Sequence, residues 1–257
     1  MIWTALATSA VTAVASAGAG LLAGLSLRGE IVRLSVRGGE PEQGSCGDCA
    51  APLPGQPAWR CEHCAGWIGA PIALEFTTAA ITALLLAKFG AQPAVAAFVY
   101  LAIIGVALTQ IDVAVQRLPD RLTLPAYPAL IVLLTVAAAT GSDWAALLRA
   151  VLGALAIGAG YLVLALASGG QVGGGDVKVA GLIGLLLGWL SWRALITGAC
   201  AGFVLAAAAT VALLAARSMT ARSMTGRRMT MRSPISFGPF LLGGALLSTL
   251  ATAIGPR

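Results

Sequence analysis

Residues 92–112 of this 257-residue chain read QPAVAAFVYLAIIGVALTQID. The first twenty of them carry no charge, and about 20 apolar residues are enough for a helix to cross the hydrocarbon core of a bilayer. The run ends on a carboxylate, Asp112. Because a carboxylate at membrane depth is energetically costly, it indicates a functional site. This stretch therefore predicts both a membrane helix and a candidate site.

The whole chain has the composition of a membrane protein. Hydrophobic residues make up 58% of it and charged residues 10%, whereas about 25% of the residues in a soluble domain are charged. The apolar stretches are long, do not alternate with polar residues and are rich in Leu and Ala, which favours helices over a β-barrel. We therefore expect an all-α, polytopic membrane protein with about eight transmembrane helices. The expected spans are residues 2–27, 70–88, 92–112, 123–141, 144–168, 177–192, 194–216 and 236–254.

Two of these spans allow an alternative. The first contains no Lys or Arg, because the first basic residue is Arg28. A cleaved signal peptide begins with a basic region, so residues 2–27 are expected to be a retained transmembrane helix. Residues 177–192 are short and Gly-rich, and a seven-span arrangement without them would place the two termini on opposite sides of the membrane.

Basic residues are distributed unevenly over the loops between the expected spans. When the loops are assigned alternately to two sides, one side receives 12 Lys and Arg residues and the other receives 4. The richer side is expected to be cytoplasmic. Both termini then lie outside, and Asp112 and Asp176 lie at the cytoplasmic face. The expected domains are a first helix (1–27), a cytoplasmic insertion (28–69) and a helical domain (70–257).

A basic loop, residues 217–235, contains a crude repeat of Arg, Met and Thr. It could contact anionic lipid headgroups, or it could be a linker that follows the positive-inside rule, which we favour. The loop is too short and unpatterned for nucleic-acid recognition, so no nucleic-acid partner is expected.

Four of the five cysteines lie in the insertion, as two Cys-x2-Cys pairs separated by eleven residues. These are Cys46, Cys49, Cys61 and Cys64. Two such pairs can place four thiolates tetrahedrally around zinc, and a four-thiolate site has no open position, which indicates a structural metal. A disulfide would need an oxidising compartment. His63, the single histidine, is interpreted as a bystander, and Cys200 lies alone in an apolar run.

A second carboxylate, Asp176, follows three glycines in the segment GGGDVK, residues 173–178. Two carboxylates at one membrane face can share a proton, which is the chemistry of aspartic proteases. Gly173 and Gly175 permit backbone conformations that other residues resist, so we expect residues 173–175 to be non-helical and to line a cavity that both aspartates face.

A third carboxylate, Asp120, has a structural interpretation. Pro119 and Pro125 are expected to break the helix on both sides of it. Asp120 is then a turn or N-cap residue for the helix that begins near Thr123.

The segments 111–125 and 173–178 resemble the two signature motifs of the type IV prepilin peptidases, a family of bacterial membrane aspartyl proteases of the GxGD type. The tetracysteine segment resembles the zinc insertion of the longer members. Residues 70–75 resemble the sequence that follows this insertion, and residues 233–240 resemble a late Phe-Gly-Pro-Phe motif. The resemblance implies that Asp112 and Asp176 are the catalytic pair. Asp120 matches the other acidic residue of the first motif, and Lys178 matches the lysine after GxGD.

The resemblance further implies an endopeptidase of the bacterial cytoplasmic (inner) membrane. Its substrates would be type IV prepilin or pseudopilin precursors, which carry a short basic leader ahead of a hydrophobic helix. Cleavage would occur at the cytoplasmic membrane face. Bifunctional members also methylate the new N-terminus and carry an Asn-containing segment that ends in Arg-Leu-Pro. Residues 25–37 lack both features, which argues against methylation, and S-adenosylmethionine would be a cofactor only if that activity is present.

The sequence is also compatible with functions of other classes. Asp112 and Asp176 could bind a coupling ion or a proton in a transporter or sensor. Transporter sites lie near the bilayer midplane, whereas these aspartates are expected at one face, and the chain shows no inverted repeat. A histidine-dependent serine protease is disfavoured because His63 lies outside the spans. A scaffold that recruits partners through the zinc insertion is a further alternative.

Overall fold

The computed structural model describes residues 18, 20–36, 43–46, 48–53, 60–66, 73–90, 92–141, 143–168, 173–221 and 237–252. Within these residues the regular structure is all-helical apart from isolated bridge residues at Ser45, Pro52 and Arg60, so the predicted all-α class is confirmed. Three expected features lie wholly or largely outside the described residues. These are the start of the first span (2–17), most of the basic loop (222–235) and the first part of the late motif (233–236).

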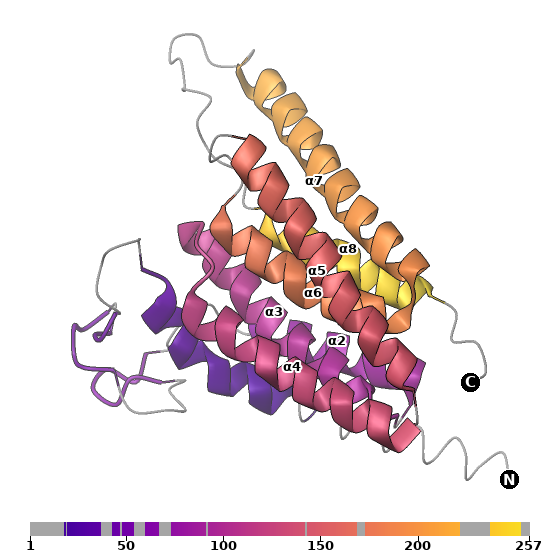
Figure 1. Ribbon diagram of the computed structural model, residues 1–257. Helices are drawn as coiled ribbons and strands as arrows, with labels where there is room; N and C mark the ends of the chain where they lie inside the picture. Colours follow the sequence, from indigo (N-terminus) through magenta and orange to yellow (C-terminus); the bar gives the residue numbers. More distant parts are fainter. Residues whose placement is uncertain are drawn as a thin grey trace, which may run out of the picture.

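The helices follow the expected spans with shifted ends. The first described helix covers residues 20–34, so it continues seven residues past the boundary expected at residue 27. The labelled helices are α2 (Ala73–Phe89), α3 (Val95–Val115), α4 (Asp120–Gly141), α5 (Trp144–Ala167), α6 (Gly174–Leu190), α7 (Trp192–Ala221) and α8 (Gly238–Ala251). Helix α7 therefore includes residues 217–221, which were expected to open the basic loop (Figure 1).

Four helices in the described part of the chain are long and apolar enough to cross a membrane: α3, α4, α5 and residues Trp192–Leu213 of α7. Helices α2 and α6 have 17 residues and α8 has 14. The helices expose large apolar side chains, such as Leu166 at 76% and Val204 at 65%. Exposure of this kind indicates contact with lipid. The number of spans, eight, stays a prediction.

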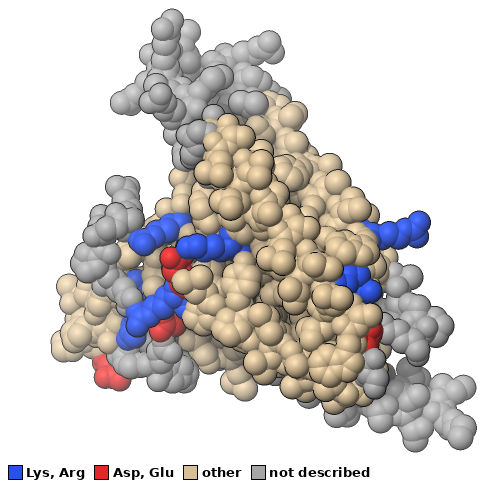
Figure 2. Space-filling view, in the orientation of Figure 1, with Lys and Arg blue, Asp and Glu red and all other residues tan. Residues whose placement is uncertain are grey.

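Charged side chains lie toward two opposite edges of the face shown in Figure 2. On the face shown in Figure 2, Lys, Arg, Asp and Glu gather near the left and right edges, with a broad uncharged band between them. Because charge is costly in the hydrocarbon region, this arrangement fits a bilayer that encloses the uncharged band.

Helix α4 corrects one expectation from the sequence. Pro125 and Pro128 lie inside the helix, whereas Pro125 was expected to break the helix after Asp120. Proline removes one backbone hydrogen bond. Membrane helices tolerate this loss because side chains and neighbouring helices satisfy the freed carbonyl groups. Asp120 begins α4, in agreement with its predicted place at a helix start.

Glycines bring α5 and α6 into backbone contact. A Cβ atom on Gly153 would lie 2.7 Å from the carbonyl oxygen of Gly184, and one on Gly184 would lie 2.6 Å from that of Gly153. Arg149 of α5 caps the far end of α6 by donating to the carbonyl oxygens of Gly188 at 2.7 Å and Trp189 at 2.6 Å. Close packing through small residues is how membrane helices associate, and here it fixes the helix that carries Asp176.

Close packing at glycines also joins α7 to α8. A Cβ atom on Gly244 would lie 2.3 Å from the backbone nitrogen of Gly202. Within the first described helix, Gly20 accepts a hydrogen bond of 2.9 Å from the Thr78 hydroxyl of α2. The N-terminal part of the bundle is therefore held to α2, and α8 is held to α7.

Candidate active site and metal centre

The predicted site residues come together at one end of the bundle. The C-terminal end of α3 carries Asp112, and the N-terminal ends of α4 and α6 carry Asp120 and Asp176. Figure 1 shows these ends, together with the start of α8, on the side of the bundle next to the tetracysteine segment. The sequence placed both aspartates at the same face, and in the structure they share one end of the bundle.

Asp112 is buried, with 5% of its surface exposed. Its Oδ2 atom accepts a hydrogen bond of 3.1 Å from the backbone N–H of Gly238, at the start of α8. The N-terminus of a helix carries partial positive charge and N–H groups without partners in the helix. The carboxylate of Asp112 therefore lies in an environment that stabilises negative charge.

Gly238 leaves no room for a side chain at this contact. A Cβ atom there would lie 2.6 Å from Oδ2 of Asp112. The sequence of residues 233–240 resembles a motif but indicates no role for Gly238. The packing of α8 against α3 reveals this role. Because Gly238 has no side chain, the Asp112 carboxylate can reach the N-terminus of α8.

Asp176 lies in the first turn of α6 and is half-buried. It is close enough to Asp112 for the two charges to interact. The structure corrects the expectation for the glycines before it. Gly173 is the extended N-cap residue, but Gly174 and Gly175 are helical. A Cβ atom on Gly175 would lie 2.8 Å from Cβ of Leu118, so this glycine allows close packing instead of breaking the helix.

Asp120 and Lys178 form an ion pair. Nζ of Lys178 lies 2.5 Å from Oδ1 of Asp120, and both side chains are exposed. The hydroxyl of Tyr127 also donates to the carbonyl oxygen of Lys178 at 2.6 Å. Helix α4 is thus tied twice to the first turns of α6, close to Asp176.

An aromatic cluster next to the aspartates had no signal in the sequence. Tyr161 of α5, Phe203 of α7 and Phe237 form mutual ring contacts, with centroids 5.5 to 6.2 Å apart. The charge of Asp176 acts on Tyr161, and Phe237 immediately precedes Gly238. Tyr161 lies within an apolar run, and its neighbours are 42 and 76 positions away in the sequence. Only the tertiary structure could therefore reveal the cluster.

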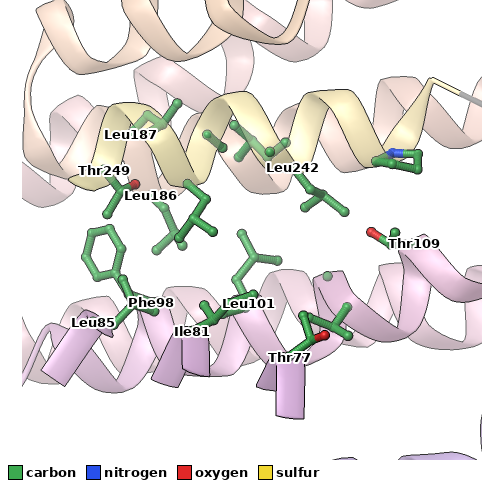
Figure 3. A pocket seen from close by; sticks show the side chains of 18 of the residues that line it. Thr77, Ile81, Leu85, Phe98, Leu101, Thr109, Leu186, Leu187, Leu242 and Thr249 are labelled. Atoms are coloured by element: carbon green, nitrogen blue, oxygen red, sulfur yellow. The ribbon is translucent and has the colours of Figure 1, made fainter. Parts of the chain in front are cut away.

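An apolar cavity of about 240 Å³ runs between α2, α3, α6 and α8 (Figure 3). Thr109 lies at one end of the view, and Phe98 and Thr249 lie at the other. Thr109, Gln110 and Pro239 belong to its lining, so it extends to within one helical turn of Asp112. Neither aspartate lines this cavity, and the common cavity expected for them stays a prediction.

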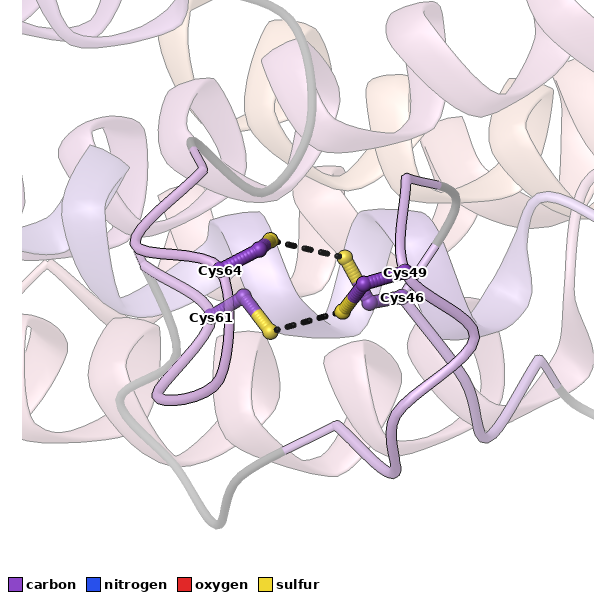
Figure 4. Close-up of side chains that lie close together, drawn as sticks. All are labelled: Cys46, Cys49, Cys61 and Cys64. Carbon is purple, nitrogen blue, oxygen red and sulfur yellow. Dashed lines mark hydrogen bonds between the residues drawn. The ribbon is translucent and has the colours of Figure 1, made fainter.

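The four predicted cysteine ligands converge from two loops (Figure 4). Their sulfur atoms all lie within 4.8 Å of one another, with Cys46 to Cys64 at 3.9 Å and Cys49 to Cys61 at 3.6 Å. Four sulfurs at 2.3 Å from a tetrahedral zinc ion are about 3.8 Å apart. The cluster therefore has the dimensions of a metal site.

The two loops have the same backbone geometry. The N–H of Cys46 donates to Ala51 and that of Ala50 donates back to Cys46. In the second loop Cys61, Gly66 and Ala65 repeat this pattern. Ala50 and Ala65 occupy equivalent places and are both left-handed, with φ of 58° and 55°.

Hydrogen bonding within the second loop prepares one thiol for a metal. Backbone hydrogen bonds with Cys64 and His63 lower the pKa of Cys61 from 9.0 to about 6. Because the thiolate is the form that binds metals, this favours ligation. His63 is exposed and is not part of the cluster, and Cys200 is exposed on α7, far along the sequence from the cluster.

A buried ion pair joins the helices on either side of the tetracysteine segment. Nε of Arg28, in the first described helix, contacts Oε1 of Glu75 in α2, and both side chains are almost fully buried. The pair links the chain before the cysteines to the chain after them. It therefore anchors both ends of the segment on the bundle.

The fold and the site define a helical membrane protein with a pair of carboxylates at one end and a cysteine site beside them. Residues 98–216, which include both aspartates, match the type IV leader peptidase family. Over these residues the chain is similar to this family, in agreement with the resemblance of its two aspartate motifs. The family name is that of a peptidase, in agreement with the predicted class of enzyme, and the apolar helices and the family together indicate a multi-pass protein of the inner membrane.

Two curated relatives are similar to this chain. Both are called prepilin leader peptidase/N-methyltransferase and come from Burkholderia pseudomallei, strains 1026b and K96243. Each is 35% identical over 194 residues, which cover 72% of this chain and 56% of the relative. The chain thus spans little more than half the length of these relatives. No solved structure matches it.

Proposed function

We propose that this chain is an aspartic endopeptidase that cleaves the basic leader from type IV pilin-like precursors. The observation that carries the proposal is the proximity of Asp112, at the end of α3, to Asp176, at the start of α6. The two carboxyl groups are close enough for their charges to interact. Two carboxylates in such a pair can act as acid and base without a covalent intermediate. The prepilin substrate comes from the family and from the names of the two relatives.

The contacts of the two aspartates assign their roles. The Gly238 N–H donates to Oδ2 of Asp112, so this oxygen is held as a hydrogen-bond acceptor, which suits the role of a base. Asp112 is then the base that takes a proton from water, and Asp176 is the acid. As the water oxygen attacks the peptide carbon, Asp176 gives its proton to the carbonyl oxygen. When the tetrahedral intermediate collapses, the proton on Asp112 passes to the leaving amine, and Asp176 takes back the proton of one hydroxyl group as the new carboxyl group forms.

The apolar cavity beside Asp112 is where we place the hydrophobic helix of the precursor. Thr109, Gln110 and Pro239 line this cavity. The first two lie within three residues of Asp112, and Pro239 follows Gly238 directly. Such a precursor has its hydrophobic segment directly after the scissile bond. With that bond at the aspartates, the following apolar side chains reach the cavity between α3 and α8.

The cytoplasmic face is the proposed side of cleavage. The uneven distribution of Lys and Arg over the loops, 12 against 4, supports this orientation. Eight spans with both termini outside, a cytoplasmic insertion at residues 28–69 and a helical protease domain from residue 70 complete the proposed arrangement.

Zinc is the metal that we propose for the four cysteines. Four thiolates suit zinc, and when bound it would serve as a structural cross-link, because no coordination position stays open. Cys46, Cys49, Cys61 and Cys64 would hold it and join the two loops. No step of peptide cleavage passes through this site.

Methylation of the new N-terminus is not part of the proposal. The names of the two relatives include N-methyltransferase, but residues 25–37 lack the Asn and the Arg-Leu-Pro ending of bifunctional members. S-adenosylmethionine is therefore not an expected ligand of this chain. Purified protein that methylates a cleaved pilin would contradict this part.

The experiment is cleavage of a pilin-like precursor by the purified membrane protein and by its Asp112→Asn and Asp176→Asn variants. Each variant loses half of the acid–base pair, which contributes about 100-fold to 10,000-fold. Both are expected to remain inserted and to lose cleavage. Cleavage at the wild-type rate by either variant would exclude the proposed mechanism.

A further inference from the structure

The hydroxyl of Tyr161 is the best candidate for a catalytic group beyond the two aspartates. Tyr161 is 4% exposed, and its hydroxyl oxygen has no hydrogen-bond partner among the described residues. Buried hydroxyl groups are nearly always hydrogen-bonded, so this hydroxyl calls for a partner other than the described residues, such as a bound substrate.

The position of this hydroxyl indicates which partner. Tyr161 lies in the electric field of Asp176, and its ring contacts Phe237 at 6.2 Å between centroids. Phe237 precedes Gly238, whose N–H holds Asp112. Tyr161 is thus packed against the same turn that orients one aspartate and lies near the other.

The tyrosine ring is held firmly. It stacks on Phe203 at 5.7 Å with an interplanar angle of 21°, and Phe203 in turn contacts Phe237. Rings from α5, α7 and the start of α8 therefore fix the hydroxyl in place. A fixed donor needs little reorganisation when charge develops beside it, which is the property of oxyanion-stabilising groups.

We propose that Tyr161 is a third catalytic residue, which donates a hydrogen bond to the oxygen of the scissile carbonyl as it becomes tetrahedral. This inference rests on the proposed peptidase function. A neutral donor suits that oxygen, which gains electron density as water adds to the carbon. The proton of Asp176 completes the neutralisation, so Tyr161 stabilises the intermediate without losing its own proton.

The test compares Tyr161→Phe with wild-type protein in precursor cleavage, measuring kcat and KM separately. Removing one oxyanion donor costs about 100-fold to 1,000-fold in kcat in a well-studied protease, and we expect a fall in kcat of at least about tenfold, with KM nearly unchanged. The substitution removes only the oxygen and keeps the ring contacts. It also removes a buried hydroxyl without a described partner, so thermal stability should stay equal or rise.

Two further variants separate catalysis from packing. Tyr100→Phe, on α3, makes the same chemical change away from the aspartates and should leave kcat unchanged. Tyr161→Leu removes the ring as well and should lower both stability and kcat. If the role of Tyr161 were only to pack, Tyr161→Phe would cleave like wild type while Tyr161→Leu would not, and this result would overturn the proposal.

The outcome is distinguishable from failure of the proposed function. If Asp112→Asn cleaves normally, the peptidase mechanism fails whatever Tyr161 does. If Asp112→Asn is inactive and Tyr161→Phe keeps the wild-type kcat, only the role of Tyr161 is refuted. An increase in KM alone would also refute it, because it would place the contact in substrate binding instead of the transition state.

Discussion

Asp112 and Gly238 are 126 positions apart in the sequence, yet the backbone N–H of Gly238 donates directly to the carboxylate of Asp112. The contact joins the last turns of α3 to the first turn of α8. It has two consequences: it holds one carboxylate in a fixed orientation, and it places that carboxylate at the positive end of a helix.

Gly238→Ala should therefore impair cleavage strongly. The new Cβ atom would lie 2.6 Å from Oδ2 of Asp112, so the carboxylate must move away from the helix end. Misplacement of a reacting group by about 1 Å can cost about 100-fold in rate, and we expect a loss of this size in kcat. Gly160→Ala in α5 is the control, because its Cβ atom would meet open space. Equal activities of the two variants would contradict the role of the contact.

Removing the Asp120–Lys178 ion pair should have a much smaller effect. Both side chains are exposed, and exposed ion pairs contribute about 0 to 1 kcal/mol. Asp120→Asn is expected to retain most of its activity, with a loss of less than about tenfold in the same cleavage assay. Inactivity equal to that of Asp176→Asn would show that Asp120 belongs to the catalytic pair.

Filling the apolar cavity should weaken binding of the precursor. Ala102 lines the cavity, and Ala102→Phe would occupy space that we assign to the substrate's hydrophobic helix. We expect KM to rise by about tenfold or more while kcat at saturation changes less. Ala139→Phe on α4, where the alanine is exposed, adds the same bulk outside the cavity and should leave KM unchanged. An unaltered KM for Ala102→Phe would refute this placement of the substrate.

Metal analysis of the purified protein should find one zinc ion per chain. The sulfur atoms already have the spacing of a tetrahedral site. Changing both Cys46 and Cys49 to Ser should abolish binding, whereas Cys200→Ser should not alter it, because Cys200 lies on α7 apart from the cluster. Zinc that remains after the double substitution would disprove the site.

Glycine at the two left-handed alanines should strengthen metal retention. Ala50 and Ala65 have φ of 58° and 55°, a conformation that costs about 1 to 2 kcal/mol for residues with a Cβ atom. Glycine avoids this cost but loses more entropy on folding, so each substitution should stabilise the loop by about 0.5 kcal/mol. Chelator challenge would measure this as a modest increase in zinc affinity, roughly twofold. Ala51→Gly, at a neighbouring position whose φ is not left-handed, should give no increase.

The sequence alone was sufficient for the properties that depend on composition and local spacing. The sequence shows a carboxylate after twenty uncharged residues, and it shows two Cys-x2-Cys pairs. Both patterns can be recognised without the fold, because each depends only on residues close together in the chain. The membrane class, the candidate aspartates and the candidate metal ligands followed from these patterns. The helix ends were less predictable: Pro125 remained inside α4, and the glycines before Asp176 became part of α6.

Only the tertiary structure decided which groups surround the aspartates. The N–H of Gly238, the Leu118 side chain against Gly175 and the ring of Tyr161 come from segments far apart in the chain. Their positions depend on the backbone contacts of α5 with α6 and of α7 with α8, where glycines let the helices approach closely. Such contacts leave no periodic signal in one sequence, because the partner of each glycine is set by how the helices pack.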